Sequence, residues 1–149
     1  MKKLYKNLKL LADIVIGKKI LKRPDFSEKK IILQAKINEQ KNLEKVKISD
    51  LSDVEFSAFS QFGEDGIISW LSHQIPDINR VFLEIGTQDY WESNTRFLIH
   101  SQNWKGYLIE ASSSDVSKIK KQSIYWKKDL KVINEFVSCD NINSLIEKN

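Results

Sequence analysis

Apolar residues in the C-terminal two thirds of the chain fall into short groups that alternate between two patterns. Runs of consecutive apolar residues with β-branched and aromatic side chains predict buried parallel strands at Val81–Ile85, 106–110 and 131–137. Apolar residues at helical spacing predict helices before, between and after these strands. The predicted helices lie at 67–75, around 97–99 after a Ser93-Asn94 cap, from 112 through Ile119, and at 141–146 after an Asp140 cap.

The alternation of strands and helices predicts an α/β fold. Helical connections between parallel strands place the strands side by side in a right-handed arrangement and cover the sheet with helices. Three strands with their helices, in this order along the chain, make the first half of a doubly wound domain.

The first 50 residues follow a different pattern. Arg23-Pro24-Asp25 is expected to break the chain between two helical stretches, the second of which is rich in Lys and Glu and covers 27–44. The first stretch is amphipathic and ends near Gly17. Its apolar face is formed by Leu4, Leu8, Leu11 and Val15.

Charge separates this N-terminal arm from the rest of the chain. Residues 1–50 carry 14 basic and 6 acidic residues, whereas residues 51–149 carry 10 and 14. The expected organisation is a basic helical arm at 1–50 followed by an α/β domain at 51–149. Packing of the arm on the domain is favoured, and contact with an anionic membrane surface is the alternative. Nucleic-acid binding is not expected, because the arm has no Trp and its Tyr5 and Phe26 are far apart.

Composition narrows the class further. The 149 residues are 41% hydrophobic and 30% charged, which is ordinary for a globular protein. Cys139 is the only cysteine, so neither an internal disulfide nor a zinc-binding cysteine set is expected. We expect a reducing, cytoplasmic location instead. The longest apolar stretch, 10–17, contains Asp13 and is far shorter than the roughly 20 residues of a membrane span.

Candidate chemistry lies where the predicted strands end, because ligands of doubly wound sheets bind beyond the carboxyl ends of the strands. The first strand ends in Glu84, and Gly86 then allows a sharp turn and close approach of a ligand to the backbone. Asp89 adds a second carboxylate in the loop. The second strand ends in Glu110, about two dozen residues after Gly86, where a carboxylate can accept hydrogen bonds from both hydroxyls of a ribose.

Two cofactors fit an acidic residue in that place. A nicotinamide dinucleotide needs a glycine-rich loop for its pyrophosphate, and Gln88 and Trp91 stand where that fingerprint has glycines. S-adenosylmethionine has no pyrophosphate and is therefore favoured. A third interpretation, in which Glu84 and Glu110 are ordinary residues at strand ends, stays open.

Four blocks of residues carry a family resemblance. They are SQFGEDGI at 60–67, FLEIG at 82–86, NTRFL at 94–98 and WKGYLIE at 104–110, and DNIN at 140–143 extends the match. Together they resemble the FkbM-type class of S-adenosylmethionine-dependent methyltransferases. The resemblance implies a Rossmann-like methyltransferase fold, with residues 61–65 packed beside the cofactor loop. It implies a cofactor site made by Glu84, Gly86, Thr87, Gln88, Asp89, Glu110 and Ser112, and no metal.

The chain departs from the family pattern after residue 143. The family continues into a fourth strand with an acidic S-I-D-x-D-G-like segment and further strands that form the substrate pocket, whereas this chain ends at Asn149. We therefore expect a truncated half-domain in which no catalytic residue is assigned and the small-molecule methyl acceptor is unknown. The alternative is a non-catalytic remnant or split half whose open sheet edge pairs with a complementing chain or another copy.

Overall fold

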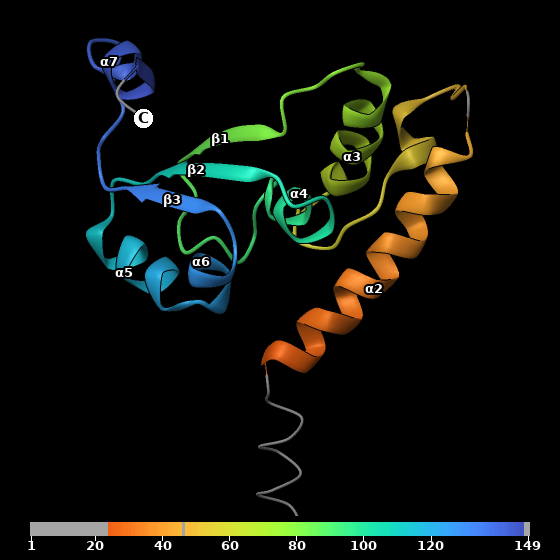
Figure 1. Cartoon of the computed structure of the whole chain (residues 1–149), viewed down its shortest axis with the longest axis horizontal. Coiled ribbons are helices and arrows are strands. Elements are labelled where there is room, and N and C mark those ends of the chain that lie inside the picture. Colours follow the sequence, from red (N-terminus) through yellow and green to blue (C-terminus); the bar gives the residue numbers. More distant parts are fainter. Residues whose placement is uncertain (1–23, 46, 148–149) are drawn as a thin grey trace, which may run out of the picture.

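The structure, a computed structural model, describes residues 24–45 and 47–147 (Figure 1). The amphipathic helix predicted at the N-terminus, which ends near Gly17, lies outside the described residues. Along the chain the elements are α2 (Pro24–Leu43), the 3-10 helix η1 (Leu51–Val54), α3 (Glu64–Gln74), β1 (Val81–Ile85), α4 (Arg96–Ser101), β2 (Lys105–Ile109), α5 (Ser113–Lys121), α6 (Ser123–Lys127), β3 (Leu130–Ile133) and α7 (Ile142–Glu147).

The three strands form one parallel sheet in the order β1-β2-β3. Leu83 lies opposite Tyr107 and Ile85 opposite Ile109, and Tyr107 in turn lies opposite Lys131. The prediction of an α/β fold with about three parallel strands and flanking helices is confirmed. Because side chains alternate along a strand, this register sorts the strand residues onto two faces of the sheet.

The covered face of the sheet carries Phe82, Glu84, Gly106, Leu108, Leu130 and Val132. Leu108 is completely buried there, in one cluster with Ile119 of α5 and Ile124 of α6. These two helices lie on the same side of the strands (Figure 1). Gly106 has no room for a side chain, since a Cβ atom would lie 2.4 Å from the Phe82 ring and 2.7 Å from the Leu130 methyl group.

The opposite face, called the open face below, has far less cover. It carries Val81, Leu83 and Ile85 of β1, Lys105, Tyr107 and Ile109 of β2, and Lys131 and Ile133 of β3. The three β1 side chains are 39–47% exposed. Helix α7 lies on this side of the sheet (Figure 1), and its Leu145 and Ile146 line a groove together with residues of the open face.

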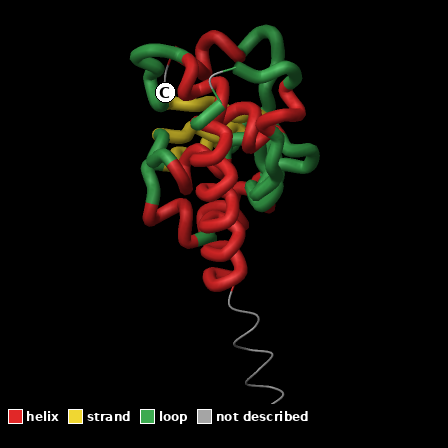
Figure 2. Tube along the Cα trace, turned by 90° about the vertical axis from the view of Figure 1, so that its right-hand side faces the viewer, coloured by secondary structure: helices red, strands yellow, loops and turns green. Residues whose placement is uncertain are grey.

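Helix α2 is the outermost helix and packs on α3 and α4. Figure 2 shows it as the long helix that passes in front of the strands in that view. Glu39 ties α2 to both neighbours, because its carboxylate accepts hydrogen bonds from the hydroxyls of Ser69 and Ser101, each at 2.6 Å. The rings of Phe56 and Phe97 meet edge to face beneath α2, with centroids 5.1 Å apart. The described part of the basic arm therefore packs on the α/β portion.

Two local predictions were wrong in detail, and one short helix was not predicted. Helix α2 includes Pro24, and the predicted break at 23–25 stays a prediction because the stretch before it lies outside the described residues. Ser93 does not cap α4, since its hydroxyl donates to Glu84 instead. Strand β3 ends at Ile133, four residues early, because the Asn134 side chain turns back to the carbonyl of Glu110. The short helix α6 was not predicted.

None of the helices among the described residues is both long enough and apolar enough to cross a membrane.

Candidate functional site

The carboxyl ends of β1 and β2 meet side by side, as the parallel order requires. The ladder continues past the strands, because the Gly86 amide donates to the Ile109 carbonyl at 2.9 Å and the Glu110 amide donates to the Ile133 carbonyl at 3.0 Å. The loop after β1 and the residues after β2 therefore begin next to each other, and this junction is the candidate site.

Glu110 joins the two segments at this junction. One carboxylate oxygen accepts the Gln88 backbone N–H at 2.7 Å, and the other accepts the Ser112 backbone N–H at 2.8 Å. Ser112 itself caps α5, since its hydroxyl accepts the Asp115 N–H at 3.2 Å. The Glu110 side chain is largely buried, yet each carboxylate oxygen retains a second lone pair for a ligand hydroxyl. The structure thus brings together Gly86, Gln88, Glu110 and Ser112.

The loop after β1 is held in an uncommon backbone conformation. Gly86 has φ +75°, and the non-glycine residues Gln88 and Tyr90 have φ +50° and +63°. A turn from Thr87 to Tyr90 is closed by the Tyr90 N–H, which donates to the Thr87 carbonyl at 2.9 Å. Left-handed backbone at two non-glycine residues costs free energy, and such strain clusters at ligand sites.

Beside the loop lies a cavity of about 170 Å³. Gly86 and Glu110 line it, together with Ala111 and residues 135–137 from the segment after β3. No atom lies within 4 Å of the place that a Cβ on Gly86 would occupy. The backbone of Gly86 is therefore open on the side where a side chain would lie.

Glu84 faces a different cavity. Its carboxylate accepts hydrogen bonds from the hydroxyls of Ser93, at 2.6 Å, and Thr95, and from the Asn94 N–H at 3.2 Å. This second cavity, of about 260 Å³, is lined by Gln61, Phe62, Glu64, Glu84, Glu92, Ser93 and Asn94. Glu84 consequently orders the segment that leads into α4, and Gln61, Phe62 and Glu64 line the same cavity as Glu84.

Thr87 and Asp89, the other two predicted site residues, are engaged within the loop. Thr87 is 3% exposed, and its hydroxyl is buried without a hydrogen-bond partner. The Asp89 side chain accepts the Trp91 N–H at 3.2 Å, while its carbonyl accepts the Gln122 side chain at 2.5 Å. Both residues therefore lie within the loop, and Asp89 connects it to the α5–α6 turn.

Arg96 is the most important residue that the sequence reasoning missed. It is 1% exposed, and its guanidinium donates to the Tyr90 carbonyl, to the Gln122 side chain and to Glu28 at 2.7, 2.8 and 2.5 Å. The guanidinium also lies 4.6 Å from the centre of the Trp91 ring. Arg96 thus fixes the far end of the loop after β1. The sequence did offer one indication of its burial, because Arg96 directly precedes the apolar residues 97–99 of the predicted helix.

Glu28 of α2 completes the ionic cluster around Arg96. His100 Nε2 lies 3.4 Å from the same carboxylate oxygen that Arg96 contacts. Interaction with His100, opposed by desolvation and reinforced by Arg96, lowers the pKa of Glu28 from 4.5 to about 2. The His100 ring stacks on Phe59 at 5.3 Å, so His100 has a structural role here.

Asp65 orders the segment before α3. One of its carboxylate oxygens accepts the backbone N–H groups of Ala58, Phe59 and Ser60 at 2.7–2.8 Å and also the Ser60 hydroxyl. Asp65 is 1% exposed. The Ser93 N–H donates to the Phe59 carbonyl, so this ordered segment supports the end of the loop after β1.

Comparisons of the chain with protein-family models, with curated proteins and with solved structures find no match.

Proposed function

We propose that this chain carries the first half of a methyltransferase-type S-adenosylmethionine site on a Rossmann-like half-domain. The observation that carries the proposal is the Glu110 bridge: a buried carboxylate binds the loop after β1 and the start of α5, beside an open glycine backbone. The resemblance of residues 60–110 to FkbM-type methyltransferases supports the same cofactor.

The residues present fit one part of this cofactor. Glu110 has carboxylate lone pairs for the two ribose hydroxyls, and Gly86 leaves its backbone accessible. The Ser112 N–H is already held by Glu110, which fixes the wall of the site next to α5. S-adenosylmethionine, when bound, supplies a methyl group activated by a sulfonium.

The site is incomplete for the whole cofactor. A cavity of about 170 Å³ is smaller than ordinary ligand pockets, which measure about 300–1,000 Å³. No side chain at this junction is placed as a base for a methyl acceptor, so catalytic residues are unassigned. We therefore propose cofactor binding as the function of the described residues, with methyl transfer dependent on groups outside them.

Calorimetric titration with S-adenosylmethionine and with its demethylated product tests the proposal. We expect saturable heat with both ligands, because the contacts proposed here do not involve the methyl group. Glu110→Ala should abolish this heat, whereas Glu44→Ala, an exposed change on the loop after α2, should leave it unchanged. Folded protein that gives no heat at millimolar ligand, or equal heat from the Glu110 variant, would contradict the proposal.

A further inference from the structure

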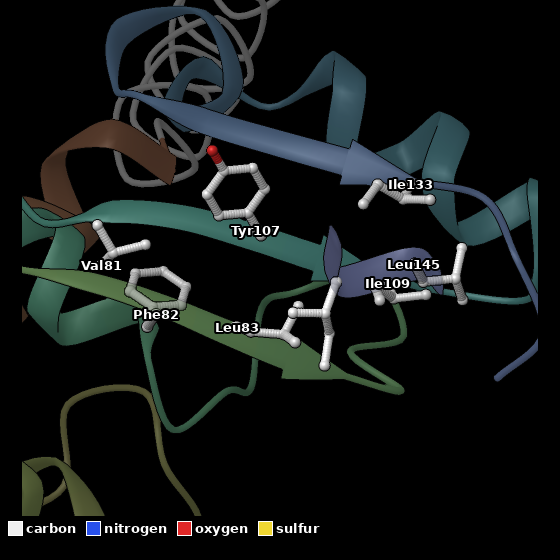
Figure 3. Close-up of a pocket in the computed structure, with 8 residues that line it drawn as sticks. Val81, Phe82, Leu83, Tyr107, Ile109, Ile133 and Leu145 are labelled. Atoms are coloured by element: carbon white, nitrogen blue, oxygen red, sulfur yellow. The ribbon is translucent and has the colours of Figure 1, made fainter. Parts of the chain in front are cut away.

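The open face of the sheet is apolar over much of its width. Val81 and Leu83 are each 39% exposed and Ile85 is 47% exposed, although all three belong to the largely apolar strand β1. Val81 and Leu83 form one side of a groove of about 290 Å³ that Tyr107 and Ile133 also line (Figure 3). The surface of the groove is mostly apolar, so its removal from water would be favourable.

Parallel sheets in α/β proteins are covered on both faces. Here α5 and α6 cover one face, while α7 is the one helix within residues 24–45 and 47–147 that lies on the other, near Ile109 and Ile133 (Figures 1 and 3). Val81 and Tyr107 lie in the part of the groove away from α7, and Leu83 lies between them and α7 (Figure 3). This exposed apolar surface is of the kind that a further helix covers in other parallel sheets.

The open face is continuous with an unpaired strand edge. β1 is the end strand of the sheet, and no strand among the described residues lies along its outer edge. In a parallel sheet, every second residue of a strand directs its N–H and C=O groups to the same neighbouring strand. Residues 80 and 86 are bonded to β2, so the even-numbered residues of β1 face β2 and the odd-numbered residues face the outer edge. The backbone groups of Leu83 therefore point outward, where a further strand can pair with them.

Chain handedness links the edge and the face. Right-handed connections from β1 to β2 and from β2 to β3 place their helices on the covered face. A right-handed connection that runs the other way, to a strand outside β1, must lie on the open face. Helix α7, which follows β3, has already moved to that side (Figure 1). One strand with its helix would therefore fill both the edge and the groove.

Charge identifies which segment fits. Lys105 and Lys131 stand on the open face, with their ammonium groups 5.2 and 5.9 Å from the centre of the Tyr107 ring. Residues 1–23 carry eight basic residues and one acidic residue, so their charge opposes docking beside these lysines. A second copy paired through β1 about a twofold axis would place two open faces on the same side and cover neither.

We propose that the open face and the outer edge of β1 bind a strand–helix segment of a partner polypeptide. The strand pairs parallel to β1, and the helix lays an aliphatic face over Val81, Leu83 and Tyr107. Acidic residues of the partner lie near Lys105 and Lys131. The inference does not depend on the proposed cofactor, which would bind at the carboxyl ends of the strands.

A synthetic strand–helix peptide tests this docking surface. The peptide joins about five strand residues to a helix of about 12 residues with Leu on one face and Glu on the other. We expect saturable binding by the full chain and slowed hydrogen exchange at the Leu83 amide. A peptide of the same composition in scrambled order should not bind, and a version with Lys in place of Glu should bind more weakly.

Two variants report whether binding uses the open face. Leu83→Asp and, separately, Val81→Asp should each weaken peptide binding at least about tenfold, as loss of a central apolar contact does. Leu71→Asp is the matched control, because Leu71 is similarly exposed at 42% but lies on α3. Unchanged binding by both open-face variants would overturn the proposal. So would a peptide-free dimer in which the Leu83 amide is already protected, because that result identifies a second copy as the occupant.

Discussion

The two faces of the sheet have opposite fates although the same strands form them. On the covered face, Phe82, Gly106 and Leu130 fit together so closely that a single added methyl group would clash. On the open face, the equally apolar Val81 and Leu83 remain more than a third exposed. The difference shows that hydrophobic character specifies a strand, whereas the arrangement of the helices decides which of its side chains become core.

The largest effect is expected from removal of the buried charge of Arg96, which joins α4 to α2. Helices α2, α3 and α4 pack on one another and are called the helical layer below. Arg96→Ala leaves Glu28 without its guanidinium partner, and breaking a buried pair in this way costs about 3–5 kcal/mol. Urea unfolding followed by circular dichroism measures the free energy of unfolding. Arg80→Ala, an exposed arginine beside β1, is the control and should change it little. A variant at residue 96 as stable as this control would show that the ionic cluster does not hold the helical layer.

A matched pair of leucines compares the two faces directly. Leu108→Ala creates a cavity in the covered face and should lower the free energy of unfolding by about 2–5 kcal/mol. Leu83→Ala on the open face should lower it by less than about 1 kcal/mol, because the side chain is already partly in water. Urea midpoints of the two variants give the comparison. Equal losses would mean that the open face is covered in solution.

The third prediction concerns pH and the contact of α2 with α4 within the helical layer. The folded pKa of Glu28 is about 2, below its ordinary 4.5, so its ionised form adds stability that is fully present above pH 4.5. That stability is lost as the pH falls toward 2. Glu28→Gln should cost about 1.5–3 kcal/mol at neutral pH, because it removes a charged hydrogen-bond acceptor.

Unfolding midpoints of the natural chain and of the Glu28→Gln variant, measured through this pH window, check the prediction. The gap between them should narrow on acidification, because Glu28 becomes protonated in the natural chain; the other carboxylates titrate in both proteins and cancel from the difference. A gap that is constant between pH 4.5 and 2 would assign the stabilisation to packing of the Glu28 side chain, not to its charge.

The smallest effect is expected at Gly86, directly after β1 at the candidate site. Gly86→Ala meets no neighbour within 4 Å, so its cost is the left-handed backbone alone, about 1–2 kcal/mol. Gly106→Ala, whose Cβ would strike Phe82, provides the contrast and should be the more destabilising of the two. Thermal unfolding separates them. If Gly86→Ala is as damaging as Gly106→Ala, the space beside Gly86 is filled in solution.

Local sequence patterns predicted the strands well. β1 lies at the predicted residues and β2 is shifted by one residue, because a short run rich in apolar residues has few other ways to be buried. The end of β3 was not predictable, since it depends on a hydrogen bond from Asn134 to the carbonyl of Glu110, which lies 24 residues away. Local sequence patterns therefore predict where a strand lies, but not the distant hydrogen-bond partner that ends it.

The sequence predicted which two strand ends meet at the candidate site, but not how the other candidate residues are arranged. Chain order and parallel pairing were sufficient to bring Gly86 and Glu110 to one edge of the sheet. The direction of the Glu84 carboxylate, toward Ser93 and away from Gly86, depends on how residues 93–95 fold back. The burial of Arg96 depends on α2, whose Glu28 lies 68 residues away in the sequence. Such contacts exist only once the helices have packed.

Glu84 has a consequence for solubility as well as for the site. It is the only charge within Val-Phe-Leu-Glu-Ile, a segment of high strand propensity without Pro or Gly. In chains that have not yet folded, such segments stack with copies of themselves into cross-β aggregates, and one charge in the stack repels the next copy. The carboxylate that organises the approach to α4 in the folded chain therefore also acts as a gatekeeper against aggregation before folding is complete.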